Sequence, residues 1–294
     1  MVSAFSSSPM GESATRYLCL VHEGRNEWWR YGLSLVIIMA CWLVLGYLPY
    51  YWLAANDAIT RLTLYIAVNF SIFMMLAGLA LAMRFVHRRP LMTLVGAGRR
   101  FDVKRILQAA AVWGAIGLAA AGIEHLLYPE RYYLSFDPGP FFVFAAVALV
   151  LTPIQTTTEE LIFRGYAMQA LSLVMRRPLA IAVVSAFIFT LPHLMNPEVH
   201  RAGLAVAASY YAIGLLLAVI TLRDGRLDLA IGAHAANNLG LALIANYEGS
   251  ALTGESIFTA RELDPGYTFV SIVAGSVLFY ALFFGRRRVP ASAT

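Results

Sequence analysis

The chain alternates long apolar segments with short polar ones, and the apolar segments predict its architecture. A helix needs about 20 mostly apolar residues to cross the hydrocarbon core of a bilayer. The segments that meet this requirement are residues 31–53, 62–86, 106–127, 141–175, 179–195, 203–222, 227–246 and 267–285. The fourth is long enough to contain a kink, which we expect at Pro153 because proline removes a helical hydrogen bond. The pattern therefore predicts an all-α, polytopic membrane protein of about eight transmembrane helices that enclose a polar intramembrane cavity.

Composition supports the membrane class. The 294 residues are 60% hydrophobic and 13% charged, whereas soluble domains are about 45–50% apolar and about 25% charged. The two cysteines, Cys19 and Cys41, have no spacing that indicates a disulfide framework. The N-terminus lacks the features of a secretory signal, so we expect the first spanning helix to remain in the mature protein.

The positive charges predict an orientation, because cytoplasmic loops carry an excess of Lys and Arg. Of the 22 Lys and Arg residues, 17 fall in the terminal segments and in the loops after the second, fourth and sixth spans. Both termini are therefore expected on the cytoplasmic side of a plasma or inner membrane. This topology and the anionic headgroups of the lipid bilayer explain the basic balance, so no nucleic-acid partner is expected.

One membrane domain is the expected organisation. Residues 1–27 are predicted to be a loosely ordered cytoplasmic segment, and residues 28–288 a single eight-helix membrane domain with a catalytic core at 140–245. Residues 289–294 are predicted to be a cytoplasmic tail.

Ionisable side chains inside predicted spans are the candidate functional groups, because each costs roughly 2.5–3.5 kcal/mol on insertion scales. The polar groups of interest are Glu159, Glu160 and Arg164 in the fourth span, His193 in the fifth, and His234 and Asn238 in the seventh. Helical rise places Glu160 and His193 at one depth, about 24 Å from the hairpin between their helices. Asn238 lies about 18 Å from its own loop by the same rise. Three helices are thus expected to bring these groups to one layer.

Spacing suggests roles for the acids in the fourth span. Glu160 and Arg164 are four residues apart on one helix face, where a carboxylate and a guanidinium can pair. Glu159 points about 100° away from Glu160. We therefore expect Arg164 to keep Glu160 ionised and oriented, and Glu159 to face water.

The two histidines and Asn238 complete a candidate hydrolytic site. His234 and Asn238 are also four residues apart, so their N–H groups can aim at one point, as a developing oxyanion requires. A carboxylate beside a histidine, Glu159 with His193, can take a proton from water during attack on a carbonyl. The predicted chemistry is hydrolysis by activated water, without a covalent enzyme intermediate.

Each polar group also has a purely structural explanation. Intramembrane ion pairs, histidines and asparagines often serve as hydrogen-bonded contacts between helices. On this basis Glu124 and His125 are assigned to the membrane interface, and Tyr210, Tyr211 and Asn69 to packing. The joint pattern on three helices is what favours a functional site.

Three motifs within residues 140–245 resemble those of the CAAX prenyl endopeptidase and bacteriocin-processing family, also called ABI or CPBP, of intramembrane glutamic proteases. They are EExxxR at 159–164, FxxxH at 189–193 and HxxxN at 234–238. The resemblance implies an eight-helix core and cleavage of a membrane-associated substrate, prenylated in one branch of the family. It implies that Glu159 and His193 activate water, that His234 and Asn238 form the oxyanion hole, and that Glu160 and Arg164 support them.

Two other functions fit the same residues. A non-catalytic scaffold or bacteriocin-immunity protein would bind a membrane peptide with them, and a proton-coupled transporter would use them as a relay. A transporter is expected to show internal repeats with paired broken helices, and the sequence shows none. No cofactor is expected. Glu and His are competent zinc ligands, but the nearby arginine and asparagine favour a metal-free site.

Overall fold

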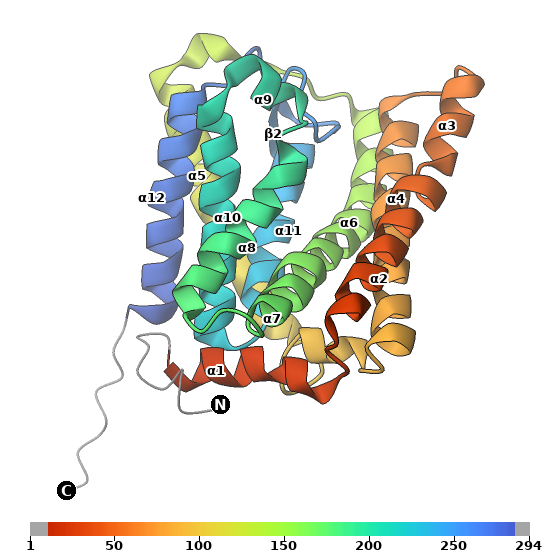
Figure 1. Cartoon of the computed structure of the whole chain (residues 1–294). Coiled ribbons are helices and arrows are strands. Elements are labelled where there is room, and N and C mark those ends of the chain that lie inside the picture. The colour runs from red at the N-terminus through yellow and green to blue at the C-terminus, as the bar shows by residue number, and fades with distance from the viewer. Residues whose placement is uncertain (1–10, 286–294) are drawn as a thin grey trace, which may run out of the picture.

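The computed structural model describes residues 11–285, and these are mostly helical (Figure 1). The helices are α1 (Gly11–Cys19), α2 (Trp28–Met39), α3 (Leu48–Ala55), α4 (Arg61–Leu81), α5 (Val103–Leu127), α6 (Pro138–Glu160), α7 (Met168–Leu171), α8 (Pro178–His193), α9 (Pro197–Ala202), α10 (Leu204–Asp224), α11 (Asp228–Leu239) and α12 (Pro265–Phe284). Short 3-10 turns are η2 (Leu20–Glu23), η5 (Leu91–Leu94) and η6 (Pro129–Arg131). Segments of π-helix are η3 (Ala40–Leu45), η4 (Ala82–Val86), η7 (Leu161–Ala167) and η8 (Gly240–Ile244).

Within residues 11–285, six helical segments are long and apolar enough to cross a membrane. They are Trp28–Ala55, Arg61–Val86, Val103–Leu127, Pro138–Leu171, Leu204–Asp224 and Pro265–Phe284. The other two predicted spans correspond to shorter helices, α8 with 16 residues and α11 with 12 residues, the latter extended by the five residues of η8. The prediction of an all-α polytopic membrane protein is confirmed. Six of the eight predicted spans have the length to cross a bilayer unaided.

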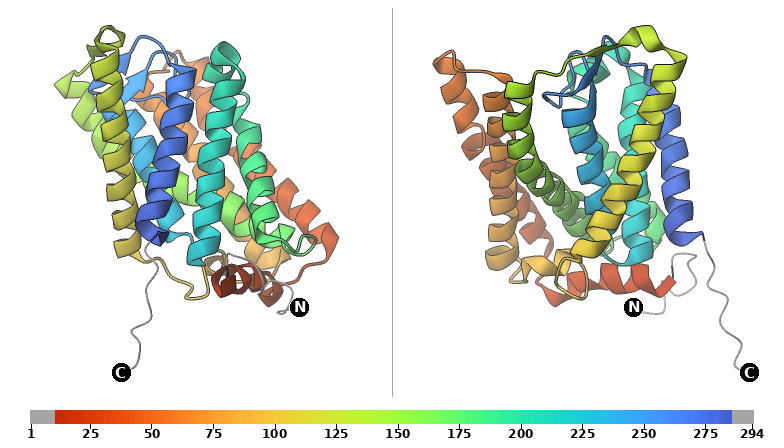
Figure 2. Two further views of the ribbon diagram at one scale, coloured as in Figure 1. Left: turned by 90° about the vertical axis from the view of Figure 1, so that its left-hand side faces the viewer. Right: turned by 180° about the vertical axis from the view of Figure 1, so that it is seen from behind.

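The long helices run side by side in a bundle, and different elements lie at its two ends (Figure 1). Helix α1 lies across one end, where α12 also finishes, and α9 lies at the opposite end (Figures 1 and 2). A small sheet of β1 (Tyr132–Leu134), β3 (Phe258–Ala260) and β2 (Ala245–Tyr247) has the order β1-β3-β2, with β1 antiparallel and β2 parallel to β3. The sheet joins the segments that follow α5, η8 and the loop before α12.

The segment before α2 is more ordered than its polar sequence predicts. A loosely ordered segment is expected over residues 1–27, but residues 11–23 form α1 and η2. Ala14, Tyr17 and Leu18 follow the spacing of one helix face and are fully buried. Residues 1–10 of that segment and the predicted tail at 289–294 lie outside the described residues.

Tyr17 ties α1 to the helix that carries the acidic motif. Its one hydroxyl hydrogen is shared between the backbone carbonyls of Leu94, at 2.7 Å, and Arg164, at 3.0 Å. The fully buried phenol thereby satisfies two backbone groups at the α1 end of the bundle. Helix α1 is part of the fold and not an appended segment.

Close packing between α5 and α11 sets the position of the histidine helix. A Cβ atom added to Gly232 would lie 2.1 Å from the carbonyl oxygen of Ile106, so only glycine allows the two backbones to approach this closely. Ala109 and Trp113 of α5 then join Ala233 of α11 in one buried cluster. His234 follows directly, so its depth and direction are determined by this helix pair.

The fourth span contains a change of helix type immediately after the two acids. The sequence predicts a kink at Pro153, and α6 contains this proline while staying α-helical on both sides of it. The regular pattern changes to π-helix at Leu161 and returns to α-helix at Met168. Segments of π-helix are rare in proteins, and those that occur often lie at functional sites. Arg164 lies within this one.

Candidate functional site

A buried ion pair forms the centre of the candidate site. Glu160 and Arg164 are both 0% exposed, and the Arg164 Nη1 donates to Glu160 Oε1 at 2.7 Å. Arg164 also donates through Nη2 to the backbone carbonyl of Gly214 on α10 at 3.2 Å. The expected pairing is therefore present, and it additionally fastens η7 to α10.

His234 joins this pair to the second acid. Its Nδ1 lies 2.7 Å from Glu160 Oε1, and its Nε2 lies 3.7 Å from Glu159 Oε2. Because Glu160 is held as a carboxylate by the guanidinium, the Nδ1 atom of His234 carries the hydrogen and donates it. The Nε2 atom is the one that faces Glu159.

Glu159 does not face open water, contrary to the expectation from its position on the helix. The whole residue is 8% exposed. Gln155, one turn earlier on α6, donates through Nε2 to Glu159 Oε1 at 3.4 Å. Both acids of the motif lie against His234, Glu160 at its Nδ1 and Glu159 at its Nε2, and the change to π-helix follows directly after them. Gln155 is not recognised from the sequence, although its position four residues before Glu159 is the signal for such a contact.

His193 is held by its own helix and by two aromatic rings. Its Nδ1–H donates to the Phe189 carbonyl at 2.8 Å, which leaves the Nε2 atom with its lone pair. The rings of Phe189 and Tyr210 pack against the imidazole at centroid distances of 4.5 and 4.6 Å. Within the described part of the chain His193 makes no hydrogen bond to Glu159, but the charge of Glu159 lies within electrostatic range of it.

Asn238 is oriented by its neighbour in the sequence. Asn237 donates through Nδ2 to Asn238 Oδ1 at 3.2 Å, and its own Oδ1 accepts from Trp113 Nε1 at 3.3 Å. The side-chain NH₂ of Asn238 has no hydrogen-bond partner among residues 11–285 and is free to donate to a ligand. The sequence does not predict a role for Asn237, because a motif of the form HxxxN assigns none to the residue before the asparagine.

Phe189 is the packing contact that brings the three helices of the site together. The Arg164 guanidinium lies over its ring at 4.2 Å, and the His234 ring meets it edge-on at 5.9 Å. A Cβ on Gly214 would lie 3.0 Å from the Phe189 ring, so the small residue allows α10 to approach. Phe189 thus contacts one polar side chain from each of the three helices, namely Arg164, His193 and His234.

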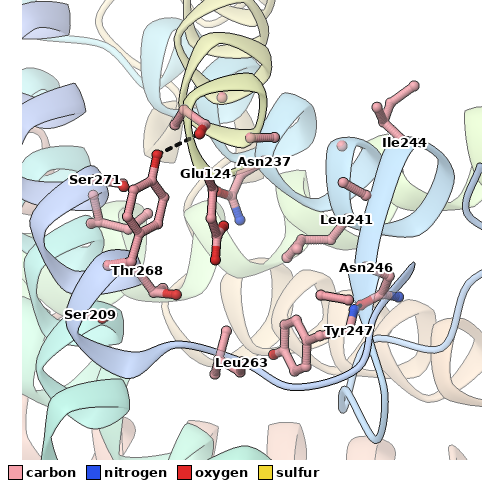
Figure 3. A pocket seen from close by; sticks show the side chains of 18 of the residues that line it. Glu124, Ser209, Asn237, Leu241, Ile244, Asn246, Tyr247, Leu263, Thr268 and Ser271 are labelled. Carbon is pink, nitrogen blue, oxygen red and sulfur yellow. Dashed lines mark hydrogen bonds between the residues drawn. The ribbon is translucent and has the colours of Figure 1, made fainter. Parts of the chain in front are cut away.

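A cavity of about 440 Å³ lies on another side of α11, between α5, α10, α11 and α12 (Figure 3). Figure 3 shows Asn237 and Glu124 beside this space, which is otherwise walled mainly by apolar side chains and glycines. Tyr210 also lines it, whereas His193 and His234 do not. The described residues therefore place a largely apolar cavity next to the polar cluster, separated from it by Asn237 and Tyr210.

The arrangement provides the parts for acid–base chemistry in a low-dielectric interior. It holds a carboxylate beside an imidazole, a second imidazole with a free nitrogen, and a free amide donor. No three His, Cys, Asp or Glu side chains among residues 11–285 are grouped as ligands for a metal ion. One oxygen of Glu160 is already occupied by both Arg164 and His234.

Together, the apolar helices and the buried ionisable cluster define a multi-pass membrane protein with a polar site in its interior. Residues 138–240 match the family model described as type II CAAX prenyl endopeptidase Rce1-like. The chain therefore carries an Rce1-like domain, and the resemblance predicted from its motifs is confirmed. This domain supports a CAAX-type membrane protease in general terms.

Two further comparisons place the chain among known proteins. It is 27% identical over 275 residues to a protein of Bacillus subtilis strain 168, the uncharacterized protein YyaK. The matched region covers 87% of this chain and 91% of that protein. No solved structure matches the chain.

Proposed function

We propose that the protein is an intramembrane endopeptidase that hydrolyses a peptide bond of a membrane-associated substrate, with or without a prenyl group. The observation that carries the proposal is the contact of His234 with both motif acids, at 2.7 Å from Glu160 and 3.7 Å from Glu159, in a site closed to bulk solvent. A structural ion pair needs only one acid, whereas the second acid here is left for chemistry.

In the proposed mechanism Glu159 and His193 activate water. Glu159 takes a proton from a water molecule as the oxygen attacks the peptide carbonyl carbon, and the free Nε2 of His193 holds that water by accepting its second hydrogen. When the tetrahedral intermediate collapses, the proton on Glu159 passes to the leaving amine. Atoms and charges balance without a covalent bond to the protein.

His234 and Asn238 are proposed to stabilise the oxyanion. A doubly protonated His234 donates Nδ1–H to Glu160 and directs Nε2–H toward the reacting carbonyl oxygen, where the free NH₂ of Asn238 is the second donor. The two carboxylates are then balanced by Arg164 and the imidazolium. This neutral set of charges suits a membrane interior, where an unbalanced charge is costly.

We further propose that both termini lie in the cytoplasm of a plasma or inner membrane, as the charge bias predicts. The partners are then the lipid bilayer and a membrane-associated peptide or protein. A non-catalytic scaffold or immunity protein and a proton-coupled transporter remain the alternatives that experiment must separate. Neither of these two alternative functions requires peptide cleavage.

The test is cleavage of membrane-anchored peptides by the purified protein in lipid nanodiscs, with and without a prenylated C-terminal cysteine, read by mass spectrometry. We expect Glu159→Ala and His193→Ala each to lower turnover by at least about 10²-fold, the contribution of a general base. The matched controls are Glu130→Ala and His200→Ala, whose side chains are exposed. Wild-type turnover in either cluster variant, with normal folding, would remove the catalytic assignment.

The substrate itself is best found by trapping. Glu159→Gln keeps the size of the side chain but not the base, so a protease should hold its substrate uncut. We expect crosslinking in native membranes to enrich a peptide on this variant that the wild-type protein cleaves when supplied with it. A scaffold would retain the same peptide on both proteins and cleave it with neither.

A further inference from the structure

A further buried acid, Glu198 on α9, lies outside the proposed mechanism. It is 2% exposed, and both of its oxygens are used: Oε1 accepts from the Tyr210 hydroxyl at 2.5 Å, and Oε2 from the backbone N–H of Ala251 at 3.0 Å. A carboxylate this deeply buried is expensive unless it is hydrogen-bonded. The two hydrogen bonds therefore indicate that Glu198 holds Tyr210 and the backbone at Ala251 in place.

The Tyr210 side chain is fixed at its hydroxyl and presents its ring to His193. The hydroxyl donates to Glu198 and accepts from Asn196 Nδ2 at 3.0 Å, so both of its hydrogen-bonding roles are filled. The phenol ring lies 4.6 Å from the His193 ring, with 37° between the planes. Asn196 follows His193 by three residues, and its backbone N–H donates to the His193 carbonyl.

The other hydrogen bond and ring contact of His193 within residues 11–285 come from its own helix. The Nδ1–H bond to the Phe189 carbonyl and the packing of the Phe189 ring both come from one turn earlier on α8. Among the described residues Phe189 and Tyr210 make no ring contact with each other, so they meet the imidazole from different sides. Tyr210 is thus an aromatic ring from another helix that packs against the imidazole.

We propose that Tyr210, anchored by Glu198 and Asn196, is a positioning residue that fixes the His193 imidazole for proton transfer. The inference rests on the proposed function and extends it to three residues outside the three motifs. Arg201 of α9 also donates to the carbonyls of Glu248 and Gly249. The loop around residues 248–251 is therefore joined to α9 and completes the support of Tyr210.

The test compares Tyr210→Leu, Tyr210→Phe and Glu198→Gln in the cleavage assay, with Tyr211→Leu as the matched control. Tyr211 is the next residue on α10 and, unlike Tyr210, makes no ring contact within the described part of the chain. We expect kcat to fall about tenfold in Tyr210→Leu with little change in KM, because misplacing a catalytic group costs rate rather than binding. Tyr210→Phe and Glu198→Gln keep the ring and should lose less, and Tyr211→Leu should match the wild type.

The pH profile of cleavage distinguishes the positioning role of Tyr210 from a purely structural one. The limb of the kcat/KM profile that disappears in His193→Ala should move in Tyr210→Leu but not in Tyr211→Leu. The groups whose charges reach His193 are Glu159, His234 and Arg164, and all remain in both variants. A lower kcat with an unmoved limb in Tyr210→Leu would overturn the inference, as would an unchanged kcat.

Nuclear magnetic resonance of ¹⁵N-labelled histidine gives a readout that does not need cleavage. The His193 signals, assigned by their loss in His193→Ala, should report a single tautomer with hydrogen on Nδ1 in the wild type and in Tyr211→Leu. In Tyr210→Leu they should report a mixture of tautomers. If no peptide is ever cleaved, the proposed function fails while this spectrum still decides the positioning role. An identical tautomer in Tyr210→Leu would overturn it.

Discussion

Removing the guanidinium of Arg164 should destabilise the protein more than removing any surface arginine. In Arg164→Leu the Glu160 carboxylate, which is 0% exposed, loses the donor that lies 2.7 Å away. Breaking a buried ion pair by deleting one partner typically costs about 3–5 kcal/mol, because the other charge stays buried and unpaired. The substitution tests whether the pair holds the site together.

Other contacts of Arg164 adjust this figure in both directions. The Gly214 carbonyl loses its side-chain donor, and the Phe189 ring loses a cation–π contact, worth up to about 2 kcal/mol when desolvated. His234 keeps its hydrogen bond to Glu160, which offsets part of the loss. We therefore expect a net loss of about 3–5 kcal/mol, or about 10 °C in melting temperature for a chain of this size.

The assay is thermal unfolding in detergent, with Arg99→Leu as the matched control. Arg99 pairs with Glu23 at 2.6 Å but on the surface, where such pairs contribute at most about 1 kcal/mol. Adding Glu160→Gln to Arg164→Leu should recover part of the lost stability, because no unpaired charge then remains. A melting temperature of Arg164→Leu equal to that of Arg99→Leu, or a double variant no more stable than the single one, would refute the reasoning.

Three more predictions concern the oxyanion donor, metal dependence and acid stability. Asn237→Ala should lower kcat about tenfold while leaving peptide binding intact, because Asn238 loses the bond that directs its NH₂; an unchanged kcat would contradict this role. Chelator treatment should leave cleavage intact, whereas a loss of activity that zinc restores would contradict the metal-free mechanism. The backbone N–H of Tyr267 holds the pKa of Asp264 below its ordinary value, so the stabilising carboxylate is fully present above about pH 4 and is lost as the pH falls below that. The melting temperature of Asp264→Asn should therefore fall less than that of the wild type in acid, and identical acid profiles would count against the helix cap.

The helices are predictable because of one strong rule: a helix that crosses a membrane needs a long run of apolar residues. Apolar runs mark every long helix within residues 11–285. Counting residues from the loops predicts one depth for Glu160 and His193. The N-terminal helix escapes prediction because that rule does not apply to it. Ala14, Tyr17 and Leu18 form a short buried stripe in a polar segment, which is the pattern of a soluble helix.

Within the candidate site, residues four apart on one helix are predictable, and contacts between helices are not. The Glu160–Arg164 pair follows from spacing alone. The contacts of both acids with His234 join two helices, and spacing within one helix does not predict which nitrogen meets which acid. The sequence assigns Tyr210 to packing because a tyrosine on an apolar helix gives no sign of the ring it faces.

The central claim is that water activated at Glu159 hydrolyses a peptide bond, and cleavage in H₂¹⁸O tests it most directly. With a membrane-anchored peptide, mass spectrometry should find one ¹⁸O atom in the new C-terminal carboxylate, and no peptide attached to the protein when the reaction is quenched. Glu159→Gln should give no labelled product. Equal labelled product from Glu159→Gln, or a peptide covalently bound to the wild-type protein, would contradict the account.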